Sequence, residues 1–147
     1  TRFDYLKMGE TLYQKRVNRY IPFQVVQIED IKNAKNLSVD QLKIKEGKKI
    51  LQKLQKGDHL ILLDEKGREF TSIQFADYLE RQKMQSYKRL IFLIGGAYGF
   101  SDDLYARANR KLAFSKMTFS HQMIRIFVLE QLYRACTIHN NEPYHNS

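Results

Sequence analysis

The chain has 147 residues, of which 43% are hydrophobic and 28% charged, and it contains one cysteine. This composition is typical of a single folded domain and excludes a disordered chain. One cysteine excludes an intrachain disulfide and a zinc site built on paired cysteines, and it fits a reducing compartment. No apolar run approaches the ~20 residues of a membrane-spanning helix, so we expect a cytoplasmic protein with no membrane partner.

Basic residues outnumber acidic ones by 25 to 16, which gives a net charge of +9. Residues 1–57 hold 13 basic and 6 acidic side chains, whereas residues 58–105 hold 6 and 8. A polyanion such as nucleic acid fits this distribution, but a solvated, solubilising surface explains it equally well. The same two alternatives apply to six lysines near the end of the basic segment: Lys43, Lys45, Lys48, Lys49, Lys53 and Lys56.

The first forty residues predict a helix, a strand and a loop. Apolar residues at three- and four-residue spacing predict a helix over residues 5–20 that ends before Pro22. Its expected inward face is Tyr5, Met8, Leu12, Tyr13, Val17 and Tyr20. Residues 23–28 are rich in β-branched side chains and predict a short strand, and residues 30–37 are polar and predict a loop.

Two capping boxes mark the starts of the next two helices. Ser38 is followed by Gln41 and Thr71 by Gln74, a spacing in which each side chain satisfies a free backbone amide. Between these helices, residues 59–64 predict a nearly continuous apolar strand that is covered on both faces.

The second half of the chain repeats the alternation of strand and helix. Residues 65–68 predict a turn, and residues 90–94 predict another apolar strand. Ser101 is expected to cap a short helix, residues 114–119 to form a short strand and loop, and Ser120 to begin a long final helix. The alternation predicts an α/β domain with a mainly parallel sheet flanked by helices, as a single domain over residues 1–147.

Three loops follow the predicted strands, where ligands bind in open α/β sheets. They are residues 63–65, 95–99 and 114–120. The glycine cluster in the second loop is neither a dinucleotide fingerprint nor a phosphate-binding loop, and it predicts either a tight turn or a ligand loop. His121, at the start of the last helix, is open to a structural role or a ligand contact.

The last helix and the tail suggest interactions beyond the fold. The helix is apolar nearly all round, through Met123, Ile124, Phe127, Val128 and Leu129, which predicts either a homodimer interface or burial under the chain's own sheet. The tail contains Pro143, Tyr144 and His145, which can complete a site if they are held in place. His139 and His145 are too far apart to predict a metal pair, so no metal is expected.

Five motifs in order resemble the ribosomal RNA large-subunit methyltransferase H family of the SPOUT class. They are residues 62–67, 92–99, 115–122, 130–135 and 143–145. The resemblance implies an α/β fold with a C-terminal trefoil knot, which acts as a homodimer and binds S-adenosylmethionine in the knot. The implied activity is methylation of N3 of a pseudouridine in 23S ribosomal RNA on the assembled ribosome.

The resemblance also implies site residues. The positions that match the family's cofactor contacts are Leu63, Gly95, Phe114, Ser115, Lys116, Met117, Thr118 and Phe119. Arg134, Tyr144 and His145 match the positions that line the substrate side, with the tail expected to reach across the dimer. The sequence departs from the family at Ser120, where proline is usual, and it lacks the family's first strand, which leads us to expect a truncated N-terminus.

Two other functions remain open from the sequence. One is a non-catalytic ribosome- or RNA-binding module with a vestigial cofactor pocket, and the other is an enzyme that uses the same cofactor on a small molecule. For the methyltransferase, we expect Arg134 and His145 to orient the base and favour its deprotonated form. No residue of the sequence is identified as a general base.

Overall fold

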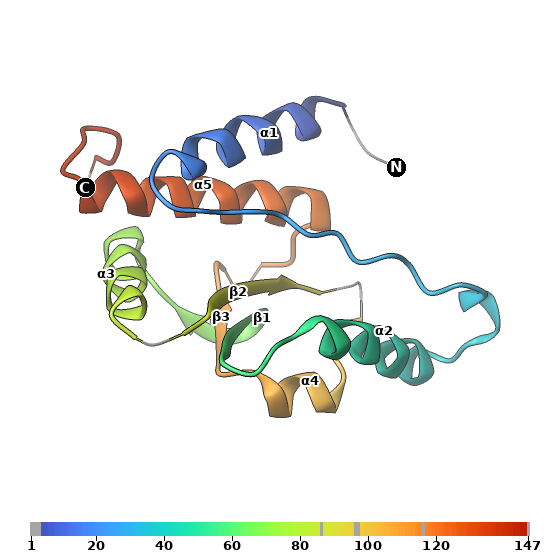
Figure 1. Ribbon diagram of the computed structural model, residues 1–147. Helices are drawn as coiled ribbons and strands as arrows, with labels where there is room; N and C mark the ends of the chain where they lie inside the picture. The colour runs from blue at the N-terminus through green and yellow to red at the C-terminus, as the bar shows by residue number, and fades with distance from the viewer. Residues whose placement is uncertain (1–3, 86, 96–97, 116, 147) are drawn as a thin grey trace. The chain divides into compact units, whose positions relative to one another are not determined.

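The computed structural model in Figure 1 describes residues 4–85, 87–95, 98–115 and 117–146. The chain forms two compact units, each built from segments that are distant in the sequence. One unit comprises Thr1–Val25, Glu69–Gln85 and Met117–Ser147, and the other comprises Val26–Arg68 and Ser86–Lys116. The expectation of one domain stays a prediction.

A three-stranded sheet is the centre of the second unit. Its strands are β1 (Asp58–Glu69), β2 (Arg89–Ile94) and β3 (Arg110–Ala113), in the spatial order β2-β1-β3. β1 and β2 pair in parallel, from Asp58 opposite Arg89 to Leu63 opposite Ile94. Together with the helices this confirms the predicted α/β class and parallel sheet.

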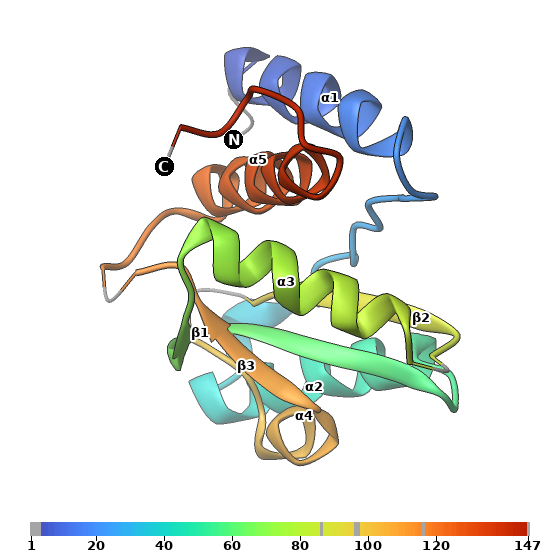
Figure 2. The same cartoon turned by 90° about the vertical axis from the view of Figure 1, so that its left-hand side faces the viewer.

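Two helices cover one face of this sheet, as Figure 2 shows: α2 (Val39–Lys53) and α4 (Asp102–Arg107). The packed residues alternate along β1 and β2, because successive side chains of a strand point to opposite faces. This core comprises Leu60, Leu62, Phe100 and Leu104, with Ile50, Leu51, Leu54, Ile91, Leu93 and Ala108 packed against it. The 3-10 helix η1 (Ala34–Asn36) precedes α2.

The close approach of α2 to α4 requires a glycine. Gly47 is buried within α2, and a Cβ atom there would overlap the side chain of Ser101. Ser101 is also the N-cap of α4, with its hydroxyl oxygen accepting from the backbone N–H of Leu104. A glycine in the middle of a helix destabilises that helix, and this contact is the structural reason for its presence.

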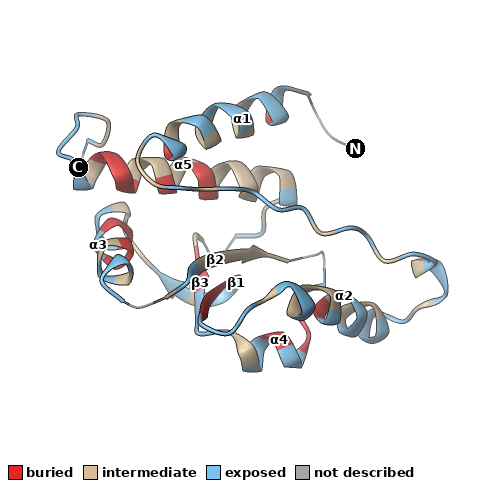
Figure 3. Ribbon diagram, in the orientation of Figure 1, coloured by how far each residue is buried: buried red, intermediate tan, exposed pale blue. Residues whose placement is uncertain are grey.

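Three helices form the first unit: α1 (Asp4–Asn18), α3 (Ser72–Lys83) and α5 (His121–His139). α5 contacts both of the others, and Figure 1 shows α1 running alongside α5. The buried residues of α5, red in Figure 3, are Val128, Leu129, Leu132, Ala135, Cys136 and Thr137. Helices of the same chain therefore cover α5, so its apolar surface does not by itself require a second copy.

The helix starts were predicted correctly. Both capping boxes are present, with Ser38 and Thr71 as the N-caps of α2 and α3. Ser101 and Ser120 cap α4 and α5. These signals are local, because a cap depends only on residues within one turn of the helix.

The expected inward face of α1 is correct only toward the end of the helix. Val17 is buried as expected, whereas Tyr5 and Met8 are 69% and 72% exposed and Leu6 is buried in their place. The inward side of the first turns contains Gly9, close to Ile126, and Glu10, which forms an ion pair with Arg125. Because these turns include a glycine and a charged residue, the apolar spacing misplaced their inward side.

Three predictions of strands and turns also differ from the structure. Residues 23–28 form no regular secondary structure, because a strand needs a neighbour to pair with and β-propensity alone does not supply one. Residues 65–68 are not a turn, since β1 continues to Glu69. The strand expected within residues 114–119 lies earlier, at Arg110–Ala113.

Among the described residues, no helix has the length and apolar character required to cross a membrane.

Candidate functional site

The ends of β1 and β2 bring two of the expected cofactor residues together. Leu63 lies opposite Ile94 in the parallel register, and Gly95 follows Ile94 directly. Both Leu63 and Gly95 are half-buried. The carboxyl ends of adjacent parallel strands thus place an apolar side chain next to a glycine, the position at which α/β sheets bind ligands.

A chain of contacts links these two strand ends. A Cβ atom at Gly95 would lie 2.7 Å from the ring of Phe100, so this position accepts only glycine without movement. The Phe100 ring meets the ring of Tyr105 edge-on, with centroids 5.9 Å apart. The Tyr105 hydroxyl donates a hydrogen bond to Oδ2 of Asp64, which is the residue after Leu63.

Charge and burial set the protonation of this pair. Burial and the hydrogen bond to Asp64 raise the pKa of Tyr105 to about 12, so its hydroxyl remains a donor. Burial opposes ionisation of Asp64, but hydrogen bonds from Tyr105 and the Lys66 backbone hold its pKa below the usual range. The Lys111 ammonium lies 5.7 Å from the centroid of the Tyr105 ring.

Part of the glycine loop is open. Gly99 has a φ of +84°, which favours glycine, and a Cβ atom there would meet no other atom within 4 Å. Phe100, which follows it, is buried. The loop therefore approaches the sheet at Phe100 and leaves space beside Gly99.

The remaining expected cofactor residues are divided between the two units. Phe114 and Ser115 are half-buried after β3 in one unit. Met117 and Thr118 are exposed in the other, and the ring of Phe119 packs edge-on against Phe127 of α5, with centroids 5.2 Å apart. Lys116 lies outside the described residues. The assignment of this stretch to a cofactor stays a prediction.

The three residues expected on the substrate side do come together. Nη1 of Arg134 lies 3.1 Å from Nδ1 of His145, and the Arg134 guanidinium stacks 4.7 Å from the centroid of the Tyr144 ring. Glu130 joins them: its Oε1 accepts hydrogen bonds from Nε (3.0 Å) and Nη2 (2.6 Å) of Arg134 and from the Tyr144 hydroxyl (3.2 Å).

The tail is held against its own chain. The Glu142 backbone N–H donates to the carbonyl of Thr137 (2.9 Å), and the hydroxyl of Tyr20 lies 2.7 Å from the Glu142 carboxylate oxygens. That hydrogen bond, with burial, raises the pKa of Tyr20 to about 12. The Tyr144 ring meets the ring of Tyr133 edge-on, at 4.7 Å between centroids. These contacts fix Tyr144 and His145 beside α5.

Sequence reasoning missed Glu130 and Tyr105 as parts of these clusters. The spacing of Glu130 and Arg134, four residues apart in a helix, is a signal that pairs them. Tyr105 and Asp64 are 41 residues apart, and no sequence pattern links them. His121, left open between two roles, is exposed at the start of α5. Among residues 4–85, 87–95, 98–115 and 117–146, no cluster of three metal-binding side chains occurs.

Comparison with known proteins decides the family. A family model described as "Predicted SPOUT methyltransferase" matches residues 1–145. A protein of Parabacteroides distasonis named Ribosomal RNA large subunit methyltransferase H is 59% identical over 134 residues, 91% of this chain and 85% of the relative. The chain belongs to the ribosomal RNA large-subunit methyltransferase H family of SPOUT methyltransferases.

Two further members of the family extend the match over nearly the whole chain. The protein of the same name from Cytophaga hutchinsonii is 57% identical over 142 residues, 97% of this chain and 91% of the relative. The one from Trichlorobacter lovleyi is 43% identical over 146 residues, 99% of this chain and 94% of the relative. Family membership therefore rests on the full sequence, including the tail.

Proposed function

We propose that this chain is an S-adenosylmethionine-dependent methyltransferase that acts on N3 of a pseudouridine in 23S ribosomal RNA on the assembled ribosome. The observation that carries the proposal is the match, at up to 59% identity, to relatives named Ribosomal RNA large subunit methyltransferase H. The proposal includes the family's C-terminal trefoil knot and a homodimer.

The residues at the strand ends fit the proposed cofactor. An adenine ring needs apolar walls and backbone donors and acceptors. The half-buried Leu63 supplies an apolar wall, Gly95 supplies backbone without a side chain, and the space beside Gly99 allows close approach. When bound, S-adenosylmethionine supplies a methyl group on a sulfonium, whose carbon–sulfur bond breaks with its electron pair left on sulfur. In our proposal Leu63, Gly95 and residues 114–119 hold it.

The cluster beside α5 has the chemistry to act on the base. Methyl transfer needs positioning above all, and the orientation of two reactants supplies several kcal/mol of the barrier reduction. Arg134 offers a fixed positive charge, and Tyr144 offers a ring for stacking. We assign Arg134, Tyr144 and His145 to binding and orienting the target base and to favouring its deprotonated form.

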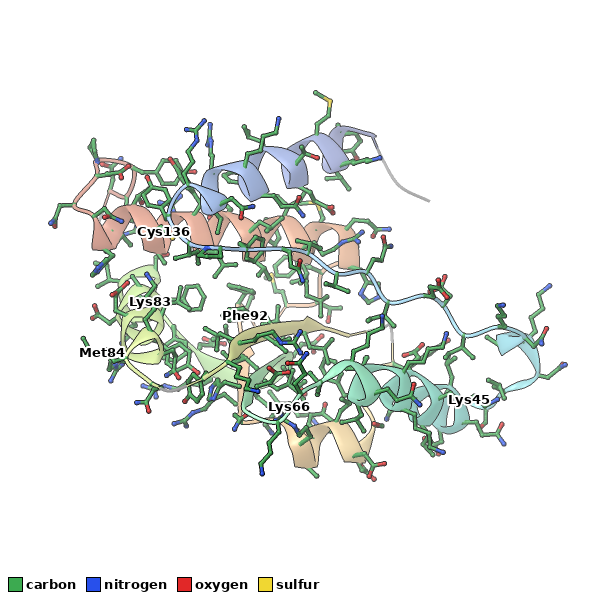
Figure 4. All side chains as sticks on the ribbon, in the orientation of Figure 1. Lys45, Lys66, Lys83, Met84, Phe92 and Cys136 are labelled. Carbon is green, nitrogen blue, oxygen red and sulfur yellow. The ribbon has the colours of Figure 1, made fainter. Side chains whose placement is uncertain are left out.

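Contact with the ribosome rests on phosphate-binding side chains. Three exposed lysines lie on α2, Lys45, Lys48 and Lys53, and a fourth, Lys56, follows the helix; Lys45 is labelled in Figure 4. At 3.6 residues per turn, Lys45, Lys48 and Lys53 fall on one side of α2. They provide a positive surface for RNA phosphates, whereas specificity comes from the shape of the assembled ribosome.

A ribosome methylation assay tests the proposal. Ribosomes that lack the modification are incubated with the protein and labelled S-adenosylmethionine, and the modified nucleotide is mapped by mass spectrometry. We expect one methyl group on N3 of one pseudouridine, and little reaction with a short naked hairpin. Cofactor binding measured by calorimetry without methylation of any ribosomal RNA would instead point to an enzyme acting on small molecules, and no cofactor binding at all would point to a binding module.

Two variants test the site. Arg134→Ala and His145→Ala are expected to reduce methylation far more than cofactor affinity, because the cluster is assigned to the target base. An equal loss of methylation and of cofactor affinity would show that these residues hold the fold together. His139→Ala is the matched control, since His139 lies on the same helix and its Nε2 lies 3.2 Å from the Glu80 carboxylate.

A further inference from the structure

The contact between Arg134 and His145 determines where the histidine carries its proton. A guanidinium has five N–H donors and no acceptor, and it does not lose its charge in proteins. The 3.1 Å contact between Nη1 of Arg134 and Nδ1 of His145 therefore requires a lone pair on Nδ1. An imidazole that accepts at Nδ1 carries its proton on Nε2, and Nε2 then presents an N–H to whatever lies beyond the ring.

From this geometry we propose that Glu130 and Arg134 hold His145 as the Nε2–H tautomer, so that His145 donates a hydrogen bond to the target base and does not accept its proton. The proposal rests on the proposed function for the identity of the base. Glu130 acts through Arg134 and is a positioning residue, whereas His145 is the residue that touches the substrate.

Glu130 fixes the direction of the Arg134 donor. Its Oε1 accepts from both Nε and Nη2 of Arg134, and such paired hydrogen bonds fix the guanidinium plane. Nη1, which makes no bond to Glu130, is then directed at His145. Without Glu130, the long arginine side chain regains several rotamers, and its Nη1 donor is no longer fixed on His145.

The Glu130 carboxylate is itself anchored. Its Oε2 accepts from Nε2 of Gln131 at 3.0 Å, and Oε1 of Gln131 accepts from the hydroxyl of Ser72 at 2.9 Å. The Tyr144 hydroxyl adds a third donor on Oε1 at 3.2 Å. The orientation of Arg134 therefore rests on two helices, α5 and α3, and on the tail.

A fixed N–H donor suits the chemistry of a pseudouridine. N3 lies between two carbonyl groups, so negative charge spreads onto their oxygens when N3 loses its proton to solvent water. A preorganised donor aimed at such an oxygen stabilises the charge where it develops. A histidine that instead accepted the N3 proton at Nε2 would first need the other tautomer, which removes the acceptor that faces Arg134.

Nitrogen-15 NMR of the histidine side chains tests the tautomer directly on the full-length protein, without ribosomes. The chain has four histidines, and the signals of His145 are identified by their loss in His145→Gln. At pH 8 we expect the Nε2–H tautomer alone in the unaltered protein. In Arg134→Met and Glu130→Gln we expect a mixture of both tautomers.

The outcomes are separable from those of the proposed function. A Nδ1–H ring in the unaltered protein, or the same tautomer population in Arg134→Met, would overturn the proposal even if ribosomes are methylated. A pure Nε2–H signal in a protein that methylates no ribosome would leave the tautomer assignment standing and reject the proposed function.

A kinetic measurement links the tautomer to the reaction. At saturating cofactor, Glu130→Gln is expected to lower the single-turnover methylation rate about tenfold, less than the roughly 10²–10³-fold of a direct donor, with unchanged cofactor affinity. Glu142→Gln is the matched control. Glu142 lies in the same tail as His145, but its carboxylate accepts a hydrogen bond from the hydroxyl of Tyr20 rather than from Arg134. An equal rate loss in both variants, with His145 still entirely Nε2–H, would show only that the tail had been loosened.

Discussion

Asp58 and Arg89 lie opposite each other at the first residues of β1 and β2, and their side chains form a two-bond ion pair. Nε of Arg89 lies 2.9 Å from Oδ1 of Asp58 and Nη2 lies 2.6 Å from Oδ2. The backbone N–H of Gln55 also donates to Oδ2 at 2.7 Å. The Asp58 side chain has no exposed surface, whereas that of Arg89 is 41% exposed. One carboxylate thus joins the end of α2 to the starts of two strands.

Removing this carboxylate should destabilise the protein. Asp58→Ala leaves the Gln55 amide and the Arg89 guanidinium without their acceptor, and we expect a loss of about 1–3 kcal/mol in the free energy of unfolding. Urea denaturation measures it. The control is Asp77→Ala on the exposed side of α3, expected to change stability by less than about 0.5 kcal/mol. Equal effects of the two substitutions would contradict the role given to the ion pair.

The same pair predicts an acid-dependent loss of stability. Hydrogen bonds from Arg89 hold the pKa of Asp58 below its ordinary value of 3.8. The stabilisation is therefore complete above that value and is lost as the pH falls through the lower folded pKa. Between pH 5 and pH 2, the unfolding free energy of the unaltered protein should fall more steeply than that of Asp58→Ala; parallel curves would refute this.

His59 predicts a second effect in a higher pH range. Its ring is buried and lies 4.3 Å from the ring of Tyr87, and burial, together with the charges of Arg110 and Arg107, lowers its pKa. The unfolded chain then takes up a proton before the native state does, so stability falls as the pH drops below the unfolded value of about 6.5. We expect the melting temperature of His59→Phe to vary less between pH 7 and pH 5 than that of the unaltered protein.

A methyl group at Gly95 should disturb the carboxyl ends of β1 and β2, where we propose that the cofactor binds. Gly95→Ala places a Cβ atom 2.7 Å from the ring of buried Phe100, so either the ring or the end of β2 must move, at about 1–3 kcal/mol for overpacking. Calorimetry should show weaker S-adenosylmethionine binding. Gly9→Ala is the control: its Cβ would lie an ordinary 3.6 Å from Ile126, and in the middle of α1 it should stabilise the helix.

The exposed lysines of α2 and of the loop after it predict the salt dependence of the proposed ribosome binding. Replacing Lys45, Lys48, Lys53 and Lys56 by glutamine should weaken binding and reduce the slope of log affinity against log salt by about 0.7–0.9 for each lost phosphate contact. Lys83→Gln on α3 is the control, because Lys83 is already paired with Glu80 at 2.8 Å; both it and Lys45 are labelled in Figure 4. An unchanged slope in the fourfold variant would show that α2 faces solvent.

The sequence predicts those parts of the structure in which the interacting residues lie close together along the chain. The N-caps Ser38 and Thr71 were predicted because a cap acts within one helical turn. The parallel pairing of β1 with β2 followed from their apolar runs. The inward face of α1 was not predictable, because its contacts include Gly9 and Glu10, which carry no apolar signal.

The candidate site shows the same contrast. The family motifs placed Arg134, Tyr144 and His145 together, and the structure brings them within contact. The role of Glu130 in aiming Arg134 requires atomic positions, because an i,i+4 pair on a helix is usually only a surface contact. The link from Tyr105 to Asp64 depends on how α4 packs on the sheet, which no local pattern encodes.

The burial of Cys136 in α5 has a practical consequence. It is the only cysteine of the chain, and burial raises the pKa of its thiol, so little reactive thiolate is present at neutral pH. A cysteine introduced at an exposed position such as Met84, which is 85% exposed, would therefore react first with a maleimide dye. Site-specific fluorophores can be attached without first replacing the native residue, and their spectra can test the proposed docking on the ribosome in real time.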